Sequence, residues 1–362
     1  MKHKSLIYLI IQLTSYLYWK HMEYFIKKML YGGKNGQQLY WLKSYLRYYA
    51  PIFNREDSLK KLIAEAENRR ENLYIKARVN FYNKLEEKCQ LPNTAHSIGD
   101  YKLDKEVRKH FQTNSHDALA KTYFFDSHEI LRWFDQDLKF GHMFGDNIDA
   151  LPYPMITKTR PIEGDNHNDV LLKLDKNRHF IFLRDSLRFE DKSNKLICRC
   201  SINGQAQREL LFQKYYGKDW CDLGFVGNDP KNIYPVSWKG TKISLYDHLK
   251  YKFIACFEGN DVASNLKWVM SSNSIAVTNK PKYESWFMES YLIPDYHYIC
   301  VDDDLENLKD KLDYYIAHPD VCKKILRNAH DYVEQFKDSR REFLIGILVM
   351  KKYFEMTNQL EP

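Results

Sequence analysis

The chain has 362 residues, of which 44% are hydrophobic and 28% are charged, as in an ordinary globular protein. This length exceeds what one hydrophobic core usually supports, so we expect two domains with a ligand-binding cleft between them. The seven cysteines are odd in number and scattered without a C-x-x-C pair. This pattern excludes a disulfide-rich secreted scaffold and favours a reducing compartment.

The formal net charge of +7 arises at the start of the chain, where residues 1–80 carry 15 Lys+Arg against 6 Asp+Glu. The sequence predicts a basic helical segment over residues 1–95, with breaks near Gly36, Pro51 and Pro92. Its longest apolar stretch, Leu6–Trp19, is too short and too polar to span a membrane. Its interleaved basic and aromatic residues either contact the anionic inner leaflet or form a solvated helical face. We expect a cytoplasmic protein, and on the first interpretation a peripheral one at the inner membrane.

Two α/β domains are predicted over residues 96–192 and 193–340, followed by a C-terminal helix over 341–362. In the second domain, a strand, a turn, a helix and another strand form a βαβ unit, and a third strand and two helices follow. The βαβ unit and the third strand are predicted at Lys252–Phe257, Glu258–Asp261, Val262–Met270, Ser274–Val277 and Tyr296–Val301. Asp302–Asp304 are expected to begin the helix after the third strand, and Asp320 to cap the helix after that.

Ligands of parallel α/β domains bind beyond the carboxyl ends of the strands, where helices begin. The segment after the strand Lys252–Phe257 holds this position, and it is either a ligand-binding loop or a plain turn with Asp261 as the helix cap. Its candidate binding residues are Glu258, Gly259, Asn260, Ser264, Asn265 and Lys267.

Two arginines follow the apolar strand near residue 197. Arg199 ends the strand and Arg208 lies in the next helix, so the two guanidinium groups either clamp a diphosphate or form surface ion pairs. Cys198 and Cys200 are expected on the strand face opposite Arg199. We expect no metal site there, and we interpret Asp302–Asp304 as a helix cap rather than a metal motif.

Several carboxylates of the first α/β domain are candidates for a general base, which would deprotonate an attacking hydroxyl. They are Glu163, Asp165, Asp169 and Asp185, and each taken alone is equally consistent with a surface acid. Either Arg178 or His179 can face the cleft, and His179 would have only a minor role as a proton carrier.

Taken together, several segments resemble glycosyltransferase family 90, and most closely its bacterial lipopolysaccharide branch. The resemblance covers residues 100–340 and is carried by Cys198–Cys200 with Arg208, by Lys252–Trp268, by Ser274–Val277 and by the two helices that follow. It implies a GT-B fold, in which two Rossmann-like domains face a cleft. It also implies a nucleotide-sugar donor, no obligatory metal, and inversion of the anomeric centre.

The resemblance also implies roles for particular residues. Arg199 and Arg208 would contact the donor phosphates, Gly259–Ser264 would form the donor loop on the second domain, and Asp169 would be the base on the acceptor-side first domain. Asp165 and Glu163 remain alternatives to Asp169. Asn265 departs from the family pattern, because many members have Arg at that position, and Lys267 would then supply the missing charge.

The expected function is therefore an inverting transfer of a hexose from UDP-glucose or UDP-galactose to a lipopolysaccharide core sugar such as a heptose. No cofactor is expected, because the nucleotide sugar is a substrate. The alternative is a non-catalytic protein that binds a sugar or an anionic glycolipid, which the departure at Asn265 would favour. No nucleic-acid partner is expected, because the sequence contains no recognised binding motif.

Overall fold

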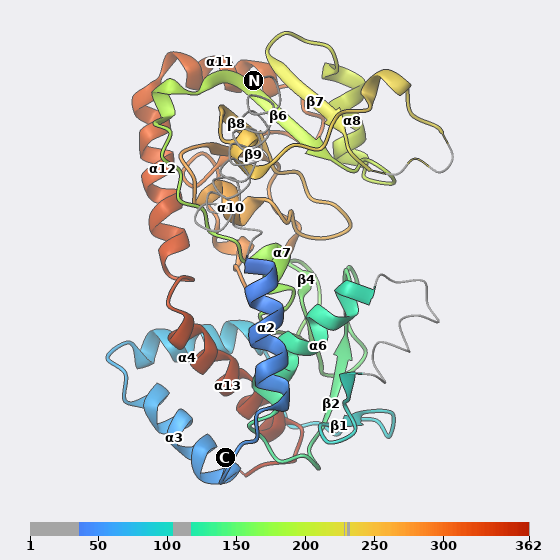
Figure 1. Ribbon diagram of the computed structural model, residues 1–362, viewed down its shortest axis with the longest axis vertical. Coiled ribbons are helices and arrows are strands. Elements are labelled where there is room, and N and C mark those ends of the chain that lie inside the picture. The colour runs from blue at the N-terminus through green and yellow to red at the C-terminus, as the bar shows by residue number, and fades with distance from the viewer. Residues whose placement is uncertain (1–35, 104–116, 228, 230–231, 362) are drawn as a thin grey trace, which may run out of the picture.

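The computed structural model describes residues 36–103, 117–227, 229 and 232–361. It is an α/β protein with parallel strands and covering helices. Figure 1 shows two bodies stacked along the longest axis, with helix α12 (Pro319–Glu334) running down one side of the upper body. The expectations for residues 1–35, including the apolar stretch Leu6–Trp19, lie outside the described residues. No helix in the described ranges is long and apolar enough to cross a membrane.

The lower body contains the first half of the chain. Its sheet has the strand order β1-β2-β3-β5, in which β2, β3 and β5 are parallel and β1 is antiparallel to β2. The strands are β1 (His96–Ser97), β2 (Lys139–Met143), β3 (Met155–Thr157) and β5 (Asp169–Leu171). The helices are α2 (Gly36–Tyr49), α3 (Arg55–Glu67), α4 (Asn72–Tyr82), α6 (Asp117–Leu131) and α7 (Lys176–His179). The break expected near Pro51 is confirmed, because this proline lies between α2 and α3.

The upper body contains a five-stranded sheet of order β11-β9-β8-β6-β7, in which all neighbouring strands are parallel. Its strands are β6 (Ser193–Cys200), β7 (Cys221–Phe225), β8 (Tyr251–Ala255), β9 (Ile275–Thr278) and β11 (Ile299–Cys300). Its α-helices are α8 (Ala206–Tyr215), α9 (Leu245–His248), α10 (Leu266–Met270), α11 (Leu308–Ala317) and α12. Its 3-10 helices, each of three residues, are η1 (Phe189–Asp191), η2 (Val236–Trp238) and η3 (Glu289–Tyr291). Every residue of β9 is buried, as expected for a strand covered on both faces. The predicted βαβ unit and parallel sheet are confirmed.

Helix starts differ from the sequence expectations. Helix α10 begins at Leu266, four residues later than expected, because the segment before it is a loop that contacts the lower body. Asp302–Asp304 do not cap α11, whose N-cap residue is Asn307. Asp320 is not the cap of α12 either, because that helix begins one residue earlier, at Pro319. Proline suits a first helical position, since it has no N–H group to satisfy there.

Two strands outside the main sheets join the bodies. Strand β4 (Thr159–Pro161) of the lower body pairs antiparallel with β10 (Tyr283–Ser285) of the upper one. At the centre of this pair, Arg160 donates through Nε to the Glu284 carboxylate at 2.7 Å, and both side chains are buried. The two bodies are therefore joined by a hydrogen-bonded and ion-paired contact.

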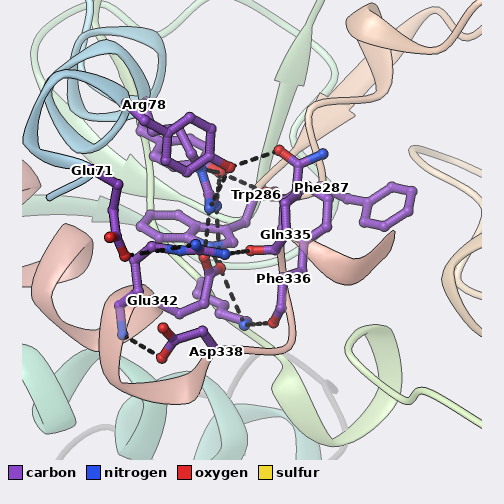
Figure 2. A network of polar contacts seen from close by, with 12 residues as sticks. Glu71, Arg78, Trp286, Phe287, Gln335, Phe336, Asp338 and Glu342 are labelled. Atoms are coloured by element: carbon purple, nitrogen blue, oxygen red, sulfur yellow. Dashed lines mark hydrogen bonds and ion pairs between the residues drawn. The ribbon is translucent and has the colours of Figure 1, made fainter. Parts of the chain in front are cut away.

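The last helix, α13 (Ser339–Met356), returns to the lower body and packs against α3, α4 and α6. Its buried Glu342 lies 2.5 Å from Arg78 of α4 and accepts a 2.6 Å hydrogen bond from the indole N–H of Trp286. Figure 2 shows how these side chains converge. Burial alone would raise the pKa of Glu342, but Lys173 and Arg78 outweigh it and hold the pKa below its ordinary value. The carboxylate thus stays ionised and joins the first, middle and last parts of the chain.

We predict that Glu342→Gln destabilises the protein. The substitution keeps the side-chain shape but leaves Arg78 without its buried counter-charge, which typically costs about 3–5 kcal/mol. Urea unfolding measures this change in the free energy of unfolding. Glu334→Gln is the matched control, because its carboxylate is 70% exposed and pairs with Lys337 on the surface. Equal unfolding midpoints for the two variants would contradict a supporting role for Glu342.

Candidate functional site

A cavity of ≈ 330 Å³ lies at the carboxyl edge of the upper sheet. Strands β6 and β8 end at it, and the start of α10 and Arg178 of α7 complete its wall. Its cationic side chains are Arg178, Arg199, Arg208 and Lys242, and Ile197, Ile254 and Trp268 provide apolar surface. A pocket with apolar walls and several guanidinium groups suits a ligand with an anionic and an apolar part.

Arg199 lies at the end of β6, where its guanidinium extends over β7. It donates to the carboxylate of Asp222 at 2.7 Å and to the Asp222 carbonyl at 2.9 Å, while its Nε is buried without a partner among the described residues. A Cβ atom at Gly224 would lie 2.9 Å from this side chain, so glycine is required beneath it. The structure therefore contains an ion pair of Arg199, which was one of the two expectations from the sequence. The Nε–H group of Arg199 makes no hydrogen bond to a described residue.

Arg208 lies in α8 and reaches the end of β8. Its Nε and one terminal nitrogen donate to the Phe257 carbonyl at 3.1 and 2.9 Å, and its other nitrogen donates to the Ser201 carbonyl at 3.2 Å. Within the described residues it has no carboxylate partner, so its positive charge is not neutralised. A Cβ atom at Gly259 would lie 3.1 Å from the guanidinium. Gly259 thus allows Arg208 to approach the loop after β8.

The other residues of this loop have different surroundings. Ser264 and Asn265 line the cavity, and the Asn265 amide donates to the Ala255 carbonyl at 2.8 Å. Glu258 instead accepts from the backbone N–H groups of Lys282 and Tyr283 and does not line the cavity. Lys267 is fully buried and lies 2.5 Å from Glu289, so it does not line the cavity either.

Contacts between the bodies hold the loop after β8, which lies beside the cavity. Lys158, which follows β3, is buried and lies 2.7 Å from both Asp146 and Asp261. Thr159 also donates to Asp261, at 2.8 Å, and Asn260 donates to Asp146 at 3.0 Å. Burial alone would lower the pKa of Lys158, but the two carboxylates outweigh it and raise the pKa above its ordinary value. Asp261 is therefore part of an inter-body ion pair and not the helix cap that the sequence suggested.

Lys158 and Asp146 were not identified from the sequence. The lysine lies in the polar run Thr157–Arg160, and nothing in its neighbourhood marks it as buried. Asp146 follows Gly145 in the loop after β2, and a carboxylate next to a loop glycine was the only signal available. Arg178, and not His179, lines the cavity. Burial lowers the pKa of His179 well below its ordinary value, and neither of its ring nitrogens has a described hydrogen-bond partner.

The candidate bases from the sequence lie apart from this cavity. Asp169 is the first residue of β5, at the amino edge of the lower sheet, where one carboxylate oxygen accepts from the Leu151 N–H at 3.0 Å. Asp165 and Glu163 lie exposed in the loop before it, and Asp185 is held by buried Lys192 at 2.7 Å. None of the four is among the described residues that line the cavity.

Asp169 is nonetheless unusual, because it is fully buried and its second carboxylate oxygen has no partner among the described residues. Burial is the main cause that raises its pKa to about 6. Cys198 and Cys200 share a strand face as expected, with their sulfur atoms 3.3 Å apart. The described residues contain no cluster of three or more His, Cys, Asp or Glu side chains arranged to hold a metal ion.

Comparisons with known proteins identify the family of the chain. A family model described as glycosyl transferase family 90 matches residues 186–355, which include most of the cavity. A protein named O-glucosyltransferase LpsA, from Dichelobacter nodosus, is 33% identical over 289 residues, covering 80% of this chain and 84% of that protein. The fold is consistent with a glycosyltransferase, and these matches define the chain as one. More narrowly, the chain belongs to glycosyltransferase family 90, which confirms the family and the enzymatic activity expected from the sequence.

We predict that Asp169→Asn changes stability in a pH-dependent manner. The raised pKa means that the folded protein binds this proton more tightly than the unfolded chain does. The stability that depends on this proton is therefore complete below about pH 4 and is lost as the pH rises through about 6. The neutral variant should melt at a higher temperature than the wild type at pH 7.5 and at the same temperature at pH 4.

Thermal unfolding at the two pH values tests this prediction. Asp165→Asn is the control, because that carboxylate is 76% exposed and its removal should leave both melting temperatures unchanged. A lower melting temperature for Asp169→Asn at pH 7.5 would show that the ionised carboxylate stabilises the fold, contrary to the expectation.

Proposed function

We propose that this protein is an inverting hexosyltransferase with a GT-B arrangement, which uses a UDP-sugar as donor and a lipopolysaccharide core sugar as acceptor. The observation that carries the proposal is the cavity with Arg178, Arg199, Arg208 and Lys242 at the carboxyl edge of a parallel sheet. The similar protein from Dichelobacter nodosus is named an O-glucosyltransferase, which supports glucose as the transferred hexose. UDP-galactose is the second donor to test.

In this proposal the donor diphosphate lies beside the guanidinium of Arg208, which has no carboxylate to neutralise it. The guanidinium groups of Arg199, which also pairs with Asp222, and of Arg178, which also pairs with Asp175, complete the anion contacts. Positive charges fixed before the reaction stabilise the negative charge that develops on the departing diphosphate. The side-chain contacts of Arg208 to two carbonyl groups hold it in place, so little reorganisation is needed when the donor binds.

The acceptor hydroxyl would attack the anomeric carbon from the face opposite the diphosphate, while a carboxylate takes the hydroxyl proton. Asp169 remains the base predicted from the sequence, supported by its raised pKa and its unpartnered oxygen, although it is buried. Asp146 is the structural alternative, because its side chain is 34% exposed and Asn260 of the proposed donor loop donates a hydrogen bond to it. Glu163 and Asp165 remain further candidates from the sequence.

We also propose that the enzyme works in the cytoplasm at the inner-membrane surface, where a core glycolipid would be presented. The donor is a substrate, and no cofactor or metal is part of this mechanism. A heptose of the core is the first acceptor to test, and this choice depends on the resemblance seen in the sequence.

Stabilisation by nucleotide sugars tests the donor site, because a ligand that binds only the folded state raises its melting temperature. We expect UDP-glucose to stabilise the wild type and Arg208→Ala to weaken that binding at least tenfold, since one hydrogen-bonded charge contact contributes about 1.5–3 kcal/mol. Arg188→Ala is the control, because Arg188 is exposed and pairs with Asp191. No stabilisation of the wild type by any nucleotide sugar would contradict the proposal.

The pH dependence of kcat/KM distinguishes the two bases. If Asp169 is the base, the rate should decline below about pH 6, because its carboxyl group then becomes protonated. Although burial opposes it, Lys158 holds the pKa of Asp146 below its ordinary value of 3.8, so with that base the rate stays level down to pH 4. Asp169→Asn and Asp146→Asn should each be assayed, with NMR of the product for its anomeric configuration. Retention of configuration would contradict the inverting mechanism.

A further inference from the structure

Helix α2 buries one face and exposes large apolar side chains on the other. Toward α6 it places Trp41, Tyr45 and Tyr48, whose rings contact Phe124 and Phe125. The outward face carries a row of apolar side chains, 53–75% exposed, at three- and four-residue spacing. This row, called the apolar ridge below, consists of Leu39, Leu42, Leu46 and Tyr49. Single exposed leucines are common, but a continuous row on one helix indicates a contact surface.

A second pocket of ≈ 220 Å³ opens beside the apolar ridge, among α2, α6, α7 and α13. Figure 1 shows α2 lying along α6, with α7 at the upper end of α2. The pocket is lined by the cationic side chains of Lys43, Arg47, Lys173 and Lys176, and by the carboxylates of Glu129 and Glu342. Lys43 and Arg47 directly follow two leucines of the ridge in sequence, so they border it on the helix surface.

The cations of this pocket are only partly neutralised. Glu129 is shared by Arg47 at 2.9 Å and Lys176 at 2.5 Å. Glu342 lies 3.3 Å from Lys173 but also compensates buried Arg78. Lys43 is exposed and has no ion pair or hydrogen bond to another described residue. The pocket therefore has an excess of positive charge directly beside an exposed apolar surface.

We propose that the apolar ridge and the cationic pocket together form a docking surface for an anionic lipid bilayer. The ridge would enter the interface between headgroups and acyl chains, as amphipathic helices at membranes do. The cations beside it would meet lipid phosphate groups. This inference deepens the proposed function by assigning the membrane contact to α2. It rests on the proposed function in one respect, namely that a glycolipid acceptor requires the enzyme to reach the membrane.

Charge favours a bilayer over other occupants of the ridge. A second copy of this chain would bring the same cationic border against the first, and like charges would oppose that contact. The preceding residues 1–35 contain six lysines and one glutamate, so they have the same sign of charge as the pocket. An anionic bilayer provides both an apolar layer and negative charge.

Flotation of the full chain with lipid vesicles tests the proposal, in the absence of donor and acceptor. We expect strong binding to phosphatidylcholine vesicles that contain phosphatidylglycerol and weak binding to pure phosphatidylcholine vesicles. The double variant Leu42→Asp with Leu46→Asp should bind at least tenfold more weakly. Lys43→Glu should bind at least about fivefold more weakly, since one basic residue near an anionic surface contributes about that factor.

Leu73→Asp is the matched control, because Leu73 is 77% exposed on α4, away from the ridge. It should bind the vesicles as the wild type does. Equal binding by the double variant and the wild type would overturn the proposal. A smaller particle mass for the double variant in light scattering would also overturn it, because a second copy would then cover the ridge. Stabilisation by UDP-glucose, measured separately on the same variants, shows whether donor binding fails independently of membrane docking.

Discussion

The buried ion pair between Arg78 and Glu342 is the interaction on which most of the architecture depends. It places two charges in the interior, where each requires compensation, and the compensation comes from distant parts of the chain. Arg78 comes from a helix near the start of the described chain, Glu342 from the last helix, and Trp286 from the segment after β10. If Arg78 or Glu342 moved out of this cluster, the other would stay buried without a counter-charge. The helices of the lower body and the loop that carries Trp286 are therefore held in one arrangement.

The same principle positions the loops beside the larger cavity. Lys158 is buried between Asp146 of its own body and Asp261 of the other, and Arg160 is buried against Glu284 across the β4–β10 pair. The pairs Lys158–Asp261 and Arg160–Glu284 join the two bodies, and the pair Lys158–Asp146 joins two loops of the lower body. The two pairs of Lys158 therefore form only when the loops after β2, β3 and β8 meet. The loop between β8 and α10, beside the larger cavity, is therefore fixed by contacts with the other half of the chain, and its conformation is not set by local helix signals.

The two cavities use their cations differently. Around the larger cavity, Arg208 is held by carbonyl groups alone and keeps its full charge, which suits a ligand with two phosphates. Around the smaller pocket, Glu129 and Glu342 neutralise part of the charge, and the exposed leucines of α2 lie next to it. The larger cavity therefore fits the proposed nucleotide donor, and the smaller pocket with its exposed leucines fits the proposed contact with a bilayer.

The sequence alone determined the elements with a clear period. Hydrophobic periodicity predicted the strand, helix and strand between Lys252 and Val277, and the later helix that buries Ile325, Ala329 and Val333. The family pattern indicated Arg199 and Arg208. Both signals are local in the sequence, so they could be read without the structure. Tertiary structure decided where α10 begins, that Lys267 pairs with Glu289, and that Lys158 is buried at the contact between the two bodies. These outcomes depend on partners more than 20 residues away, and in the case of Lys158 about 100 residues away, so no local pattern can encode them. The sequence therefore indicated which residues could carry charge to a ligand, and the packing of the two bodies decided which of them reach the cavity.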